Sequence, residues 1–291
     1  MTLSPGALLR ARLQKGLLVL PGVFNAITAL LAEQVGFEAL YLSGAGVTNS
    51  LLGMPDIALI TLTEMAQQAR YVARAVKLPV IADADTGYGE VLNVARTVEE
   101  FEQAGLAGLH LEDQVAPKRC GHLDGKQVIP AEEMVKKIRA AVRARSDPSF
   151  FLIARTDARS VNGLEDAIAR AKRYLDAGAD AIFPESLQSR AEFETFAKAI
   201  SAPLLANMTE FGKTPYLRAQ EFAEMGYIMV IFPMTAFRVM MHAAREALRT
   251  LKETGTQQSL LDRMQTRKEL YELLRYADYE RLDREIAEGD S

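Results

Sequence analysis

The sequence contains a single cysteine, Cys120, among 291 residues. One cysteine excludes a disulfide within the chain and a zinc site built from several thiolates. Cys120 is therefore either an inert packing residue or a reactive thiol.

Long apolar runs and a strong charge of one sign are also absent. No run reaches the roughly 18–20 apolar residues that a membrane helix needs, and the N-terminus lacks the basic-then-apolar order of a secretory signal. The formal net charge of −4 gives no electrostatic reason to expect nucleic acid or an anionic membrane as partner. We expect a cytoplasmic protein whose partner is a small molecule.

What the sequence does contain is an alternation of short aliphatic runs with amphipathic helical stretches, the pattern of a parallel sheet built from βα units. Eight units predict one (β/α)8 barrel domain over residues 1–291, with the barrel at about 15–254, rather than an open doubly wound sheet. The expected strands are Leu17–Pro21, Ala39–Ser43, Pro79–Asp83, Gly108–Glu112, Phe150–Thr156, Ala179–Glu185, Pro203–Asn207 and Tyr227–Phe232.

Helix boundaries are marked in the same register. Glycines at 36, 105, 178 and 226 precede strands, where a helix must stop. Thr61 and Glu64 have the capping-box spacing, and Pro130 stands before the acidic start Glu132-Glu133. After the eighth unit a helical tail of about residues 255–291 continues. It packs either on its own barrel or across a neighbouring subunit.

The strand ends are unusually acidic, and a barrel of this kind builds its active site there. Asp83-Ala84-Asp85 follows the third strand and Glu112 ends the fourth. Hard oxygen ligands of this sort suit Mg²⁺, and Glu112 would bind directly or through a water. The alternative is that these carboxylates only cap turns.

Two further features suggest chemistry. Arg155 ends the fifth strand and needs a carboxylate partner, either a substrate or Glu185 or Asp157 of the chain. Cys120 lies in a long polar segment between Asp113 and Pro130, where neighbouring positive charge would lower its pKa and favour the thiolate. His110, within a strand, is expected to be a core or supporting residue, and His242, on the last barrel helix, a structural one.

Four motifs together resemble the isocitrate lyase and phosphoenolpyruvate mutase superfamily. They are Lys118-Arg119-Cys120-Gly121-His122, the segment Asp83–Gly89, His110–Gln114 and Ile153–Asp157. The cysteine loop is typical of the lyase branches, and Phe183–Glu185, Ala206–Gly212 and Met264–Tyr271 are most similar to the methylisocitrate lyase branch. The resemblance implies a (β/α)8 barrel with C-terminal helices swapped within a homotetramer, and a role in propionate catabolism through the methylcitrate cycle.

Position by position, the resemblance implies Mg²⁺ on Asp83 and Asp85 and a catalytic Cys120. The residues implied to contact a tricarboxylate or dicarboxylate substrate are Ser43, Gly44, Ala45, Cys120, Gly121, Arg155, Glu185, Asn207, Met208, Thr209, Arg238 and Arg267. Pocket size, and with it specificity, is implied to depend on Phe183, Ile231 and Pro233.

The implied reaction is a magnesium-dependent, retro-aldol-like cleavage to pyruvate and succinate, in which Cys120 protonates the succinate carbanion. Tyr41, beside the Ser43 loop, is the candidate base for the substrate hydroxyl. The alternatives are a lyase for 2,3-dimethylmalate or another substituted malate, a phosphonomutase or oxaloacetate decarboxylase that does not need Cys120, and a binding barrel without activity.

Overall fold

The computed structural model describes residues 3–289, and in it the expected barrel strands are all present. The strands are β1 Leu18–Val23, β2 Leu40–Leu42, β3 Val80–Asp83, β4 Gly108–Glu112, β5 Phe151–Thr156, β6 Ala181–Pro184, β7 Leu205–Asn207 and β8 Met229–Phe232. They form one parallel sheet in the order β6-β5-β4-β3-β2-β1-β8-β7. A parallel bridge between Ile182 and Leu204 joins its two edges. The sheet is thus a nearly closed barrel, as predicted.

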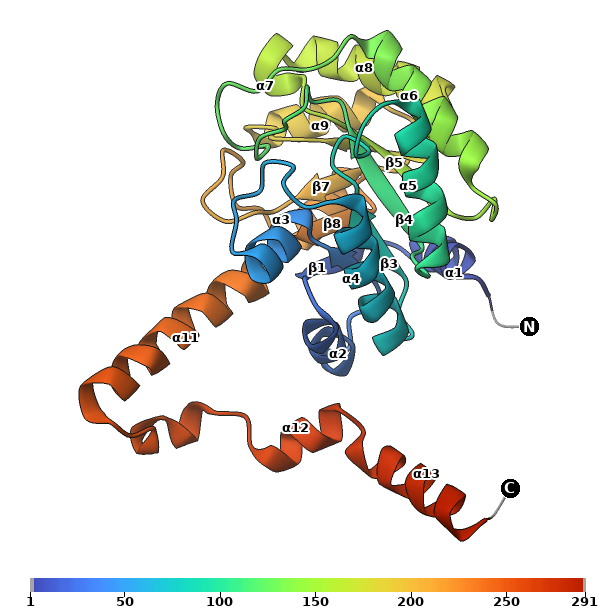
Figure 1. Cartoon of the computed structure of the whole chain (residues 1–291). Helices are drawn as coiled ribbons and strands as arrows, with labels where there is room; N and C mark the ends of the chain where they lie inside the picture. Colours follow the sequence, from blue (N-terminus) through green and yellow to red (C-terminus); the bar gives the residue numbers. More distant parts are fainter. Residues whose placement is uncertain (1–2, 290–291) are drawn as a thin grey trace. The chain divides into compact units, whose positions relative to one another are not determined.

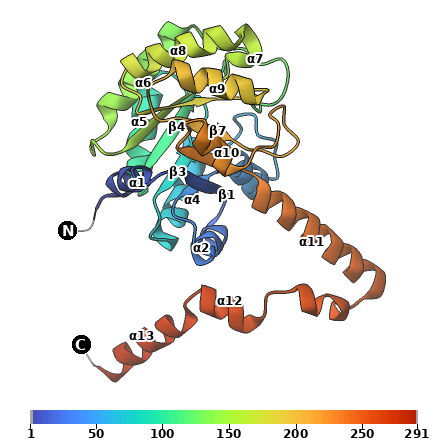
Figure 2. The same cartoon turned by 180° about the vertical axis from the view of Figure 1, so that it is seen from behind.

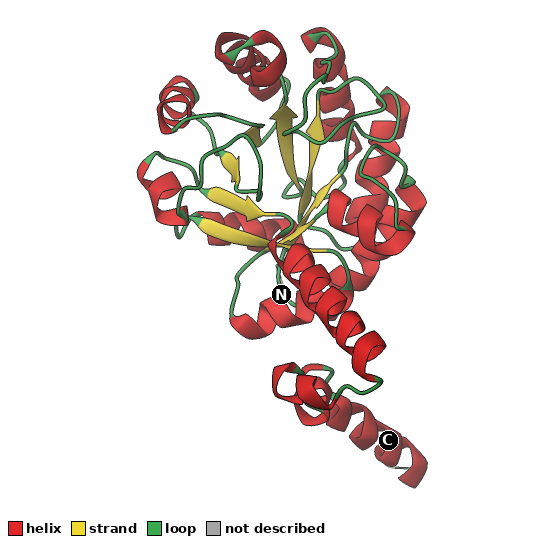
Figure 3. Cartoon of the chain, turned by 90° about the vertical axis from the view of Figure 1, so that its left-hand side faces the viewer, coloured by secondary structure: helices red, strands yellow, loops and turns green. Residues whose placement is uncertain are grey.

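The helices lie outside the strands. They are α1 Pro5–Leu13, α2 Ala26–Val35, α3 Gly44–Val47, α4 Leu62–Ala75, α5 Val91–Gln103, α6 Ala131–Ala144, α7 Arg159–Asn162, α8 Leu164–Asp176, α9 Arg190–Ala199 and α10 Ala219–Glu224, with a π-helical turn at Thr48–Leu52. In the chain, β8 is followed by α11 Thr235–Thr254. Figure 1 and, from behind, Figure 2 show α8 and α9 outside the strands, Figure 2 also labels α10 next to β7, and Figure 3 shows helices around the strands.

The predicted helix boundaries are confirmed. Gly36 ends α2 with φ 97°, in the left-handed region that a side chain would disfavour. Thr61 caps α4 through a reciprocal capping box with Glu64. Pro130 is the N-cap of α6, whose first turn carries two acidic residues. Local sequence signals therefore place the helix ends correctly.

Two apolar cores hold the barrel together. One fills the space between strands and helices, and the other fills the inside of the barrel with residues such as Leu20, Ile81, Ile153 and Met229. Leu9 of α1 is fully buried and belongs to the inner core, together with Leu18 and Ala181, the first residues of β1 and β6. Helix α1 thus covers the N-terminal end of the barrel, and the polar site lies at the other end.

The chain separates into two compact units, the first ending at Phe237 and the second beginning at Arg238, inside α11. The second unit continues through a 3₁₀ helix at Gln258–Arg263, α12 Arg267–Leu273 and α13 Tyr276–Glu288. Tyr271 and Tyr276 stack with ring centroids 4.7 Å apart. Many apolar side chains of this unit are exposed, among them Met241, Leu248 and Ile286. No helix among residues 3–289 is long and apolar enough to cross a membrane.

Candidate active site

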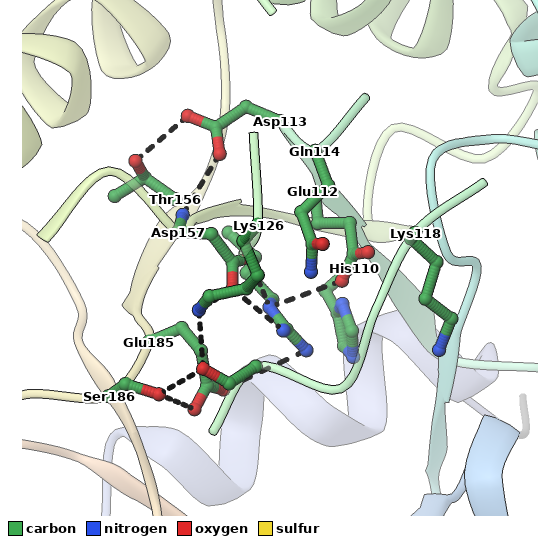
Figure 4. A network of polar contacts seen from close by, with 12 residues as sticks. His110, Glu112, Asp113, Gln114, Lys118, Lys126, Thr156, Asp157, Glu185 and Ser186 are labelled. Carbon is green, nitrogen blue, oxygen red and sulfur yellow. Dashed lines mark hydrogen bonds and ion pairs between the residues drawn. The ribbon is translucent and has the colours of Figure 1, made fainter. Parts of the chain in front are cut away.

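Buried charged side chains from several strand ends meet at the C-terminal end of the barrel (Figure 4). The carboxylates include Asp83, Asp85, Glu112, Asp113, Asp157 and Glu185, and the cations include Lys118, Lys126, Arg155 and Arg170. Burial of this many charges is costly unless they are paired. The ion pairs among these side chains, and the oxygens left without a partner, therefore indicate what kind of ligand the site could bind.

The acidic turn follows β3, as predicted. Asp83 accepts a hydrogen bond from the backbone N–H of Asp85 at 2.9 Å, and Asp85 has φ 45°. Gly44, at the start of α3, lies so close that a Cβ there would come within 2.7 Å of Asp83 Oδ2. The segment beginning at Ser43 thus packs directly on the first carboxylate.

Lys118 is the cation nearest to this turn. Its Nζ lies 2.8 Å from Asp85 Oδ1 and 2.5 Å from Asp56 Oδ1. Burial nevertheless raises the pKa of Asp85 to about 6, with Lys118 opposing the shift. Burial acts in the same direction on Asp83, but His110, Lys118 and Arg155 outweigh it and lower the pKa of that carboxyl.

Glu112 ends β4 and is almost fully buried. Its Oε2 lies 3.2 Å from Arg155 Nε, but neither carboxylate oxygen has a hydrogen-bond partner of good geometry among the described residues. Burial raises the pKa of Glu112 well above its ordinary value. Glu112 is thus a buried carboxylate with unused acceptor capacity.

Arg155 is held mainly by Asp157. Its Nε and a terminal nitrogen lie 2.9 and 3.1 Å from the two Asp157 oxygens, and another lies 3.7 Å from Glu185 Oε2. The internal ion pair, one of the two alternatives for Arg155, is therefore present. The guanidinium carbon of Arg155 also lies over the Phe183 ring, 5.1 Å from the ring centroid, at a distance where a cation–π interaction contributes.

The Cys120 loop, residues 113–130 between β4 and α6, is held over these charges at several points. The carbonyl of Gly121 accepts from Ser186 Oγ at 2.6 Å and also from Lys126 Nζ, which lies 2.7 Å from Asp157. A Cβ on Gly121 would come within 2.6 Å of Arg155. The backbone next to the cysteine is thus seated on the Arg155 and Asp157 pair.

Cys120 itself is exposed, and the expected thiolate is wrong for this structure. Partial desolvation raises the pKa of the thiol, against the lowering effect of the His122 N–H and of Arg155. The side chains of Lys118 and His122 have other partners than the sulfur, because Lys118 pairs with Asp85 and the His122 ring contacts Glu185. The thiol is protonated at neutral pH, which suits a proton donor.

Tyr41 lies inside the barrel mouth, with its hydroxyl 2.8 Å from His110 Nε2. Burial, followed by the charge of Asp83, raises the pKa of Tyr41 well above its ordinary value. His110 is buried as expected, and burial lowers its pKa to about 4. The neutral phenol is thus a hydrogen-bonding group in this state, and its role as a base stays a prediction.

The other predicted contact residues of the first unit lie around the same mouth. Ser43 caps α3 by accepting from the Gly46 N–H, Ala45 is half-buried, and Asn207 donates to Glu185 at 3.2 Å. Met208 and Thr209 follow Asn207 and are buried. The three specificity residues are also buried, at the ends of two strands: Phe183, Ile231 and Pro233. Arg238 and Arg267 belong to the second unit, so their predicted substrate contacts stay predictions.

Lys126, Ser186 and Asp56 are part of the network, although the sequence did not single them out. In the sequence, Lys126 is one of several charged residues in a polar loop, and Ser186 follows an expected strand without any motif around it. Their importance comes from contacts across 31 and 65 residues of chain, which no local pattern reveals. Ser186 also has a φ of 59°, in the left-handed region, and nothing in the sequence around this serine indicates that conformation.

The residues present fit a divalent cation chemically, although they are not gathered around one point. Among residues 3–289 no group of three or more His, Cys, Asp or Glu side chains is close enough to hold a metal. The fit rests on the two oxygens of Glu112, which lack hydrogen-bond partners of good geometry among the described residues, and on the excess of buried carboxylates over cations. Mg²⁺ prefers such oxygens and retains several waters.

Comparisons with known proteins agree with this site. The sequence model of the family described as phosphoenolpyruvate phosphomutase matches residues 9–252. A 2-methylisocitrate lyase of Aeropyrum pernix is 56% identical over 284 residues, which are 97% of this chain and 91% of the relative.

Two solved structures extend the comparison. A 2,3-dimethylmalate lyase is 38% identical with a TM-score of 0.92, covering 98% of this chain and 96% of the other. A phosphonopyruvate hydrolase solved with oxalate and Mg²⁺ is 30% identical with a TM-score of 0.87, covering 98% and 99%.

Proposed function

The chain belongs to the phosphoenolpyruvate phosphomutase family, and we propose that it is a carbon–carbon lyase that cleaves 2-methylisocitrate to pyruvate and succinate. The observation that carries the proposal is the seating of the cysteine loop, with the Gly121 backbone against Arg155 and Glu185. A phosphonomutase has no need of a thiol at this point. A proton donor above a carboxylate-binding cation is what a succinate-forming lyase requires.

The chain's own residues account for the later part of the reaction. Removal of the C2 hydroxyl proton lets the C2–C3 bond break, and its electron pair passes to the succinate half as an enediolate. Arg155 offers positive charge to the enediolate as it forms. Cys120 then gives its proton to the carbanion and recovers one from solvent.

We assign the first proton transfer, from the substrate hydroxyl, to Tyr41. The polar groups near Tyr41 would bind the carboxylates of the substrate. The Ser43 hydroxyl and the N–H groups of Gly44 and Ala45 start a helical turn, where carboxylates bind well. Asp83, Asp85 and Glu112 would hold Mg²⁺. When bound, this ion supplies a Lewis acid for the substrate oxygens.

The exposed apolar side chains of the second unit support an assembly. We propose a homotetramer in which these helices are swapped between subunits, so that Arg238 and Arg267 contact substrate. We place the enzyme in the cytoplasm. Sedimentation equilibrium tests the assembly, and a monomer that is fully active would contradict it.

The test of the function is pyruvate release from candidate substrates, with and without a chelator. We expect 2-methylisocitrate to be turned over best, chelation to abolish turnover, and added Mg²⁺ to restore it. The rival favoured by a specific observation is 2,3-dimethylmalate cleavage, because the enzyme of that name shares the fold at a TM-score of 0.92. Equal or better turnover of dimethylmalate would replace our choice.

A further inference from the structure

His122 joins two loops that are far apart in the sequence, and the mechanism above does not use it. Its Nε2 lies 2.8 Å from Glu185 Oε1, and its Nδ1 accepts the backbone N–H of Lys213 at 3.0 Å. Lys213 belongs to the segment between β7 and α10, whereas His122 follows Cys120 by two residues. The contact is thus a bridge between the cysteine loop and a second loop of the barrel mouth.

The two hydrogen bonds define the state of the ring. Because Nδ1 accepts from a backbone N–H, it carries no proton, and the proton of the neutral imidazole is on Nε2. That N–H donates to Glu185, a buried carboxylate whose pKa Arg155 and His122 hold well below its ordinary value despite burial. The ring is therefore oriented from both sides, and its position depends on both loops.

Gly212 makes the bridge possible. A Cβ on this residue would lie 2.6, 2.9 and 3.0 Å from three atoms of the His122 ring, and these are its three nearest heavy atoms. The φ of Gly212 is not in the left-handed region, so the requirement comes from close approach rather than backbone conformation. An exposed ion pair between Lys213 and Asp124 joins the same two loops.

We propose that Gly212 and the Lys213 backbone N–H are positioning residues, which act through His122 to hold Cys120 where it protonates the substrate. We call His122, Gly212 and Lys213 the clasp. A fixed His122 holds Gly121, whose backbone already touches Glu185 and Arg155, and so limits the movement of the thiol. The inference rests on the proposed role of Cys120 as the acid.

A double-mutant cycle tests whether Gly212 acts through His122. Displacement of a reacting group by about 1 Å costs on the order of 100-fold in rate, so we expect Gly212→Ala to lower kcat about 10- to 100-fold, with KM within about threefold. In a His122→Ala background the added Cβ meets no ring, and Gly212→Ala should change kcat less than about twofold. Effects that simply multiply, or a fully active Gly212→Ala, would overturn the proposal.

Two substitutions of His122 separate its two hydrogen bonds. Asn can place a carbonyl oxygen near the position of Nδ1 and keep the bond from Lys213, whereas Gln can place an amide N–H near Nε2 and keep the bond to Glu185. Tryptic cleavage after the exposed Arg119, followed by mass spectrometry, reports loop mobility without any substrate. We expect His122→Asn to resist cleavage much better than His122→Gln, and the opposite order would overturn the clasp.

The cleavage assay also separates this inference from the proposed function. We expect Gly212→Ala to be cleaved several-fold faster than the unmodified enzyme, and the control Asp124→Asn, which removes only an exposed ion pair, to be cleaved at the unmodified rate. If 2-methylisocitrate is not a substrate, the cleavage rates still test the clasp. An unchanged cleavage rate in Gly212→Ala would overturn it even where turnover is lost.

Discussion

Replacement of Lys126 by methionine should slow the enzyme while leaving it folded. Lys126 Nζ is buried, lies 2.7 Å from Asp157 and donates to the carbonyl of Gly121. Without it, Asp157 keeps its two contacts with Arg155, so no buried carboxylate is left without a cation. The main loss is therefore a charged hydrogen bond that seats the residue next to Cys120.

The magnitude follows from this bond. Hydrogen bonds to charged groups contribute about 1.5–3 kcal/mol, and 1.36 kcal/mol corresponds to a tenfold change in rate. If the loss falls on the placement of the thiol, kcat/KM should drop roughly 10- to 150-fold. Ser186→Ala removes the other, uncharged donor to the same carbonyl, worth about 0.5–1.5 kcal/mol, and should cost at most about 10-fold.

The assay is the initial rate of pyruvate release at saturating Mg²⁺, with circular dichroism and thermal melting of each variant as the check on folding. We expect the order of activity to be unmodified enzyme, Ser186→Ala, Lys126→Met. Activity of Lys126→Met within twofold of the unmodified enzyme would refute the reasoning. So would a larger loss in Ser186→Ala than in Lys126→Met.

Three further predictions concern the proton transfers. Cys120→Ser should lower kcat about 100- to 10,000-fold, the usual contribution of a general acid, with substrate binding retained in calorimetry; near-normal turnover would end the acid assignment. Because its pKa is raised, the thiol should remain protonated above its ordinary pKa and react with iodoacetamide only at higher pH; a midpoint at or below that of free cysteine contradicts the structure. Tyr41→Phe should abolish cleavage if the phenol is the base, whereas retained turnover would move that role to another group.

Much of the fold was predictable because its signals are local. Alternating aliphatic strands and glycine exits such as Gly36 depend on residues close in sequence, and β4 has the expected bounds, Gly108–Glu112. Strand ends differ by one or two residues elsewhere. At β6, for example, the expected start Ala179 is still part of the helix exit and the strand begins at Ala181.

The candidate site was only partly predictable, because its chemistry depends on pairing across the barrel. The residues at strand ends, such as Asp83 and Arg155, follow from the fold alone. The raised pKa of the Cys120 thiol does not, since it depends first on how far the folded loop removes the sulfur from water. Lys126 illustrates the same limit, because only the folded chain brings it to Asp157.

The position of Phe183 matters for anyone who wishes to change the substrate range of this enzyme. Its ring contacts His110 edge-on at 5.4 Å and lies under the guanidinium of Arg155 at 5.1 Å. On the predicted placement of Phe183 in the pocket wall, a smaller residue there would enlarge the pocket and would also remove the ring that contacts His110 and Arg155. Ile231 lies on β8, between β1 and β7, and has no aromatic ring to place against His110 or Arg155. A library that aims at bulkier malates should therefore begin at Ile231 and keep Phe183 fixed.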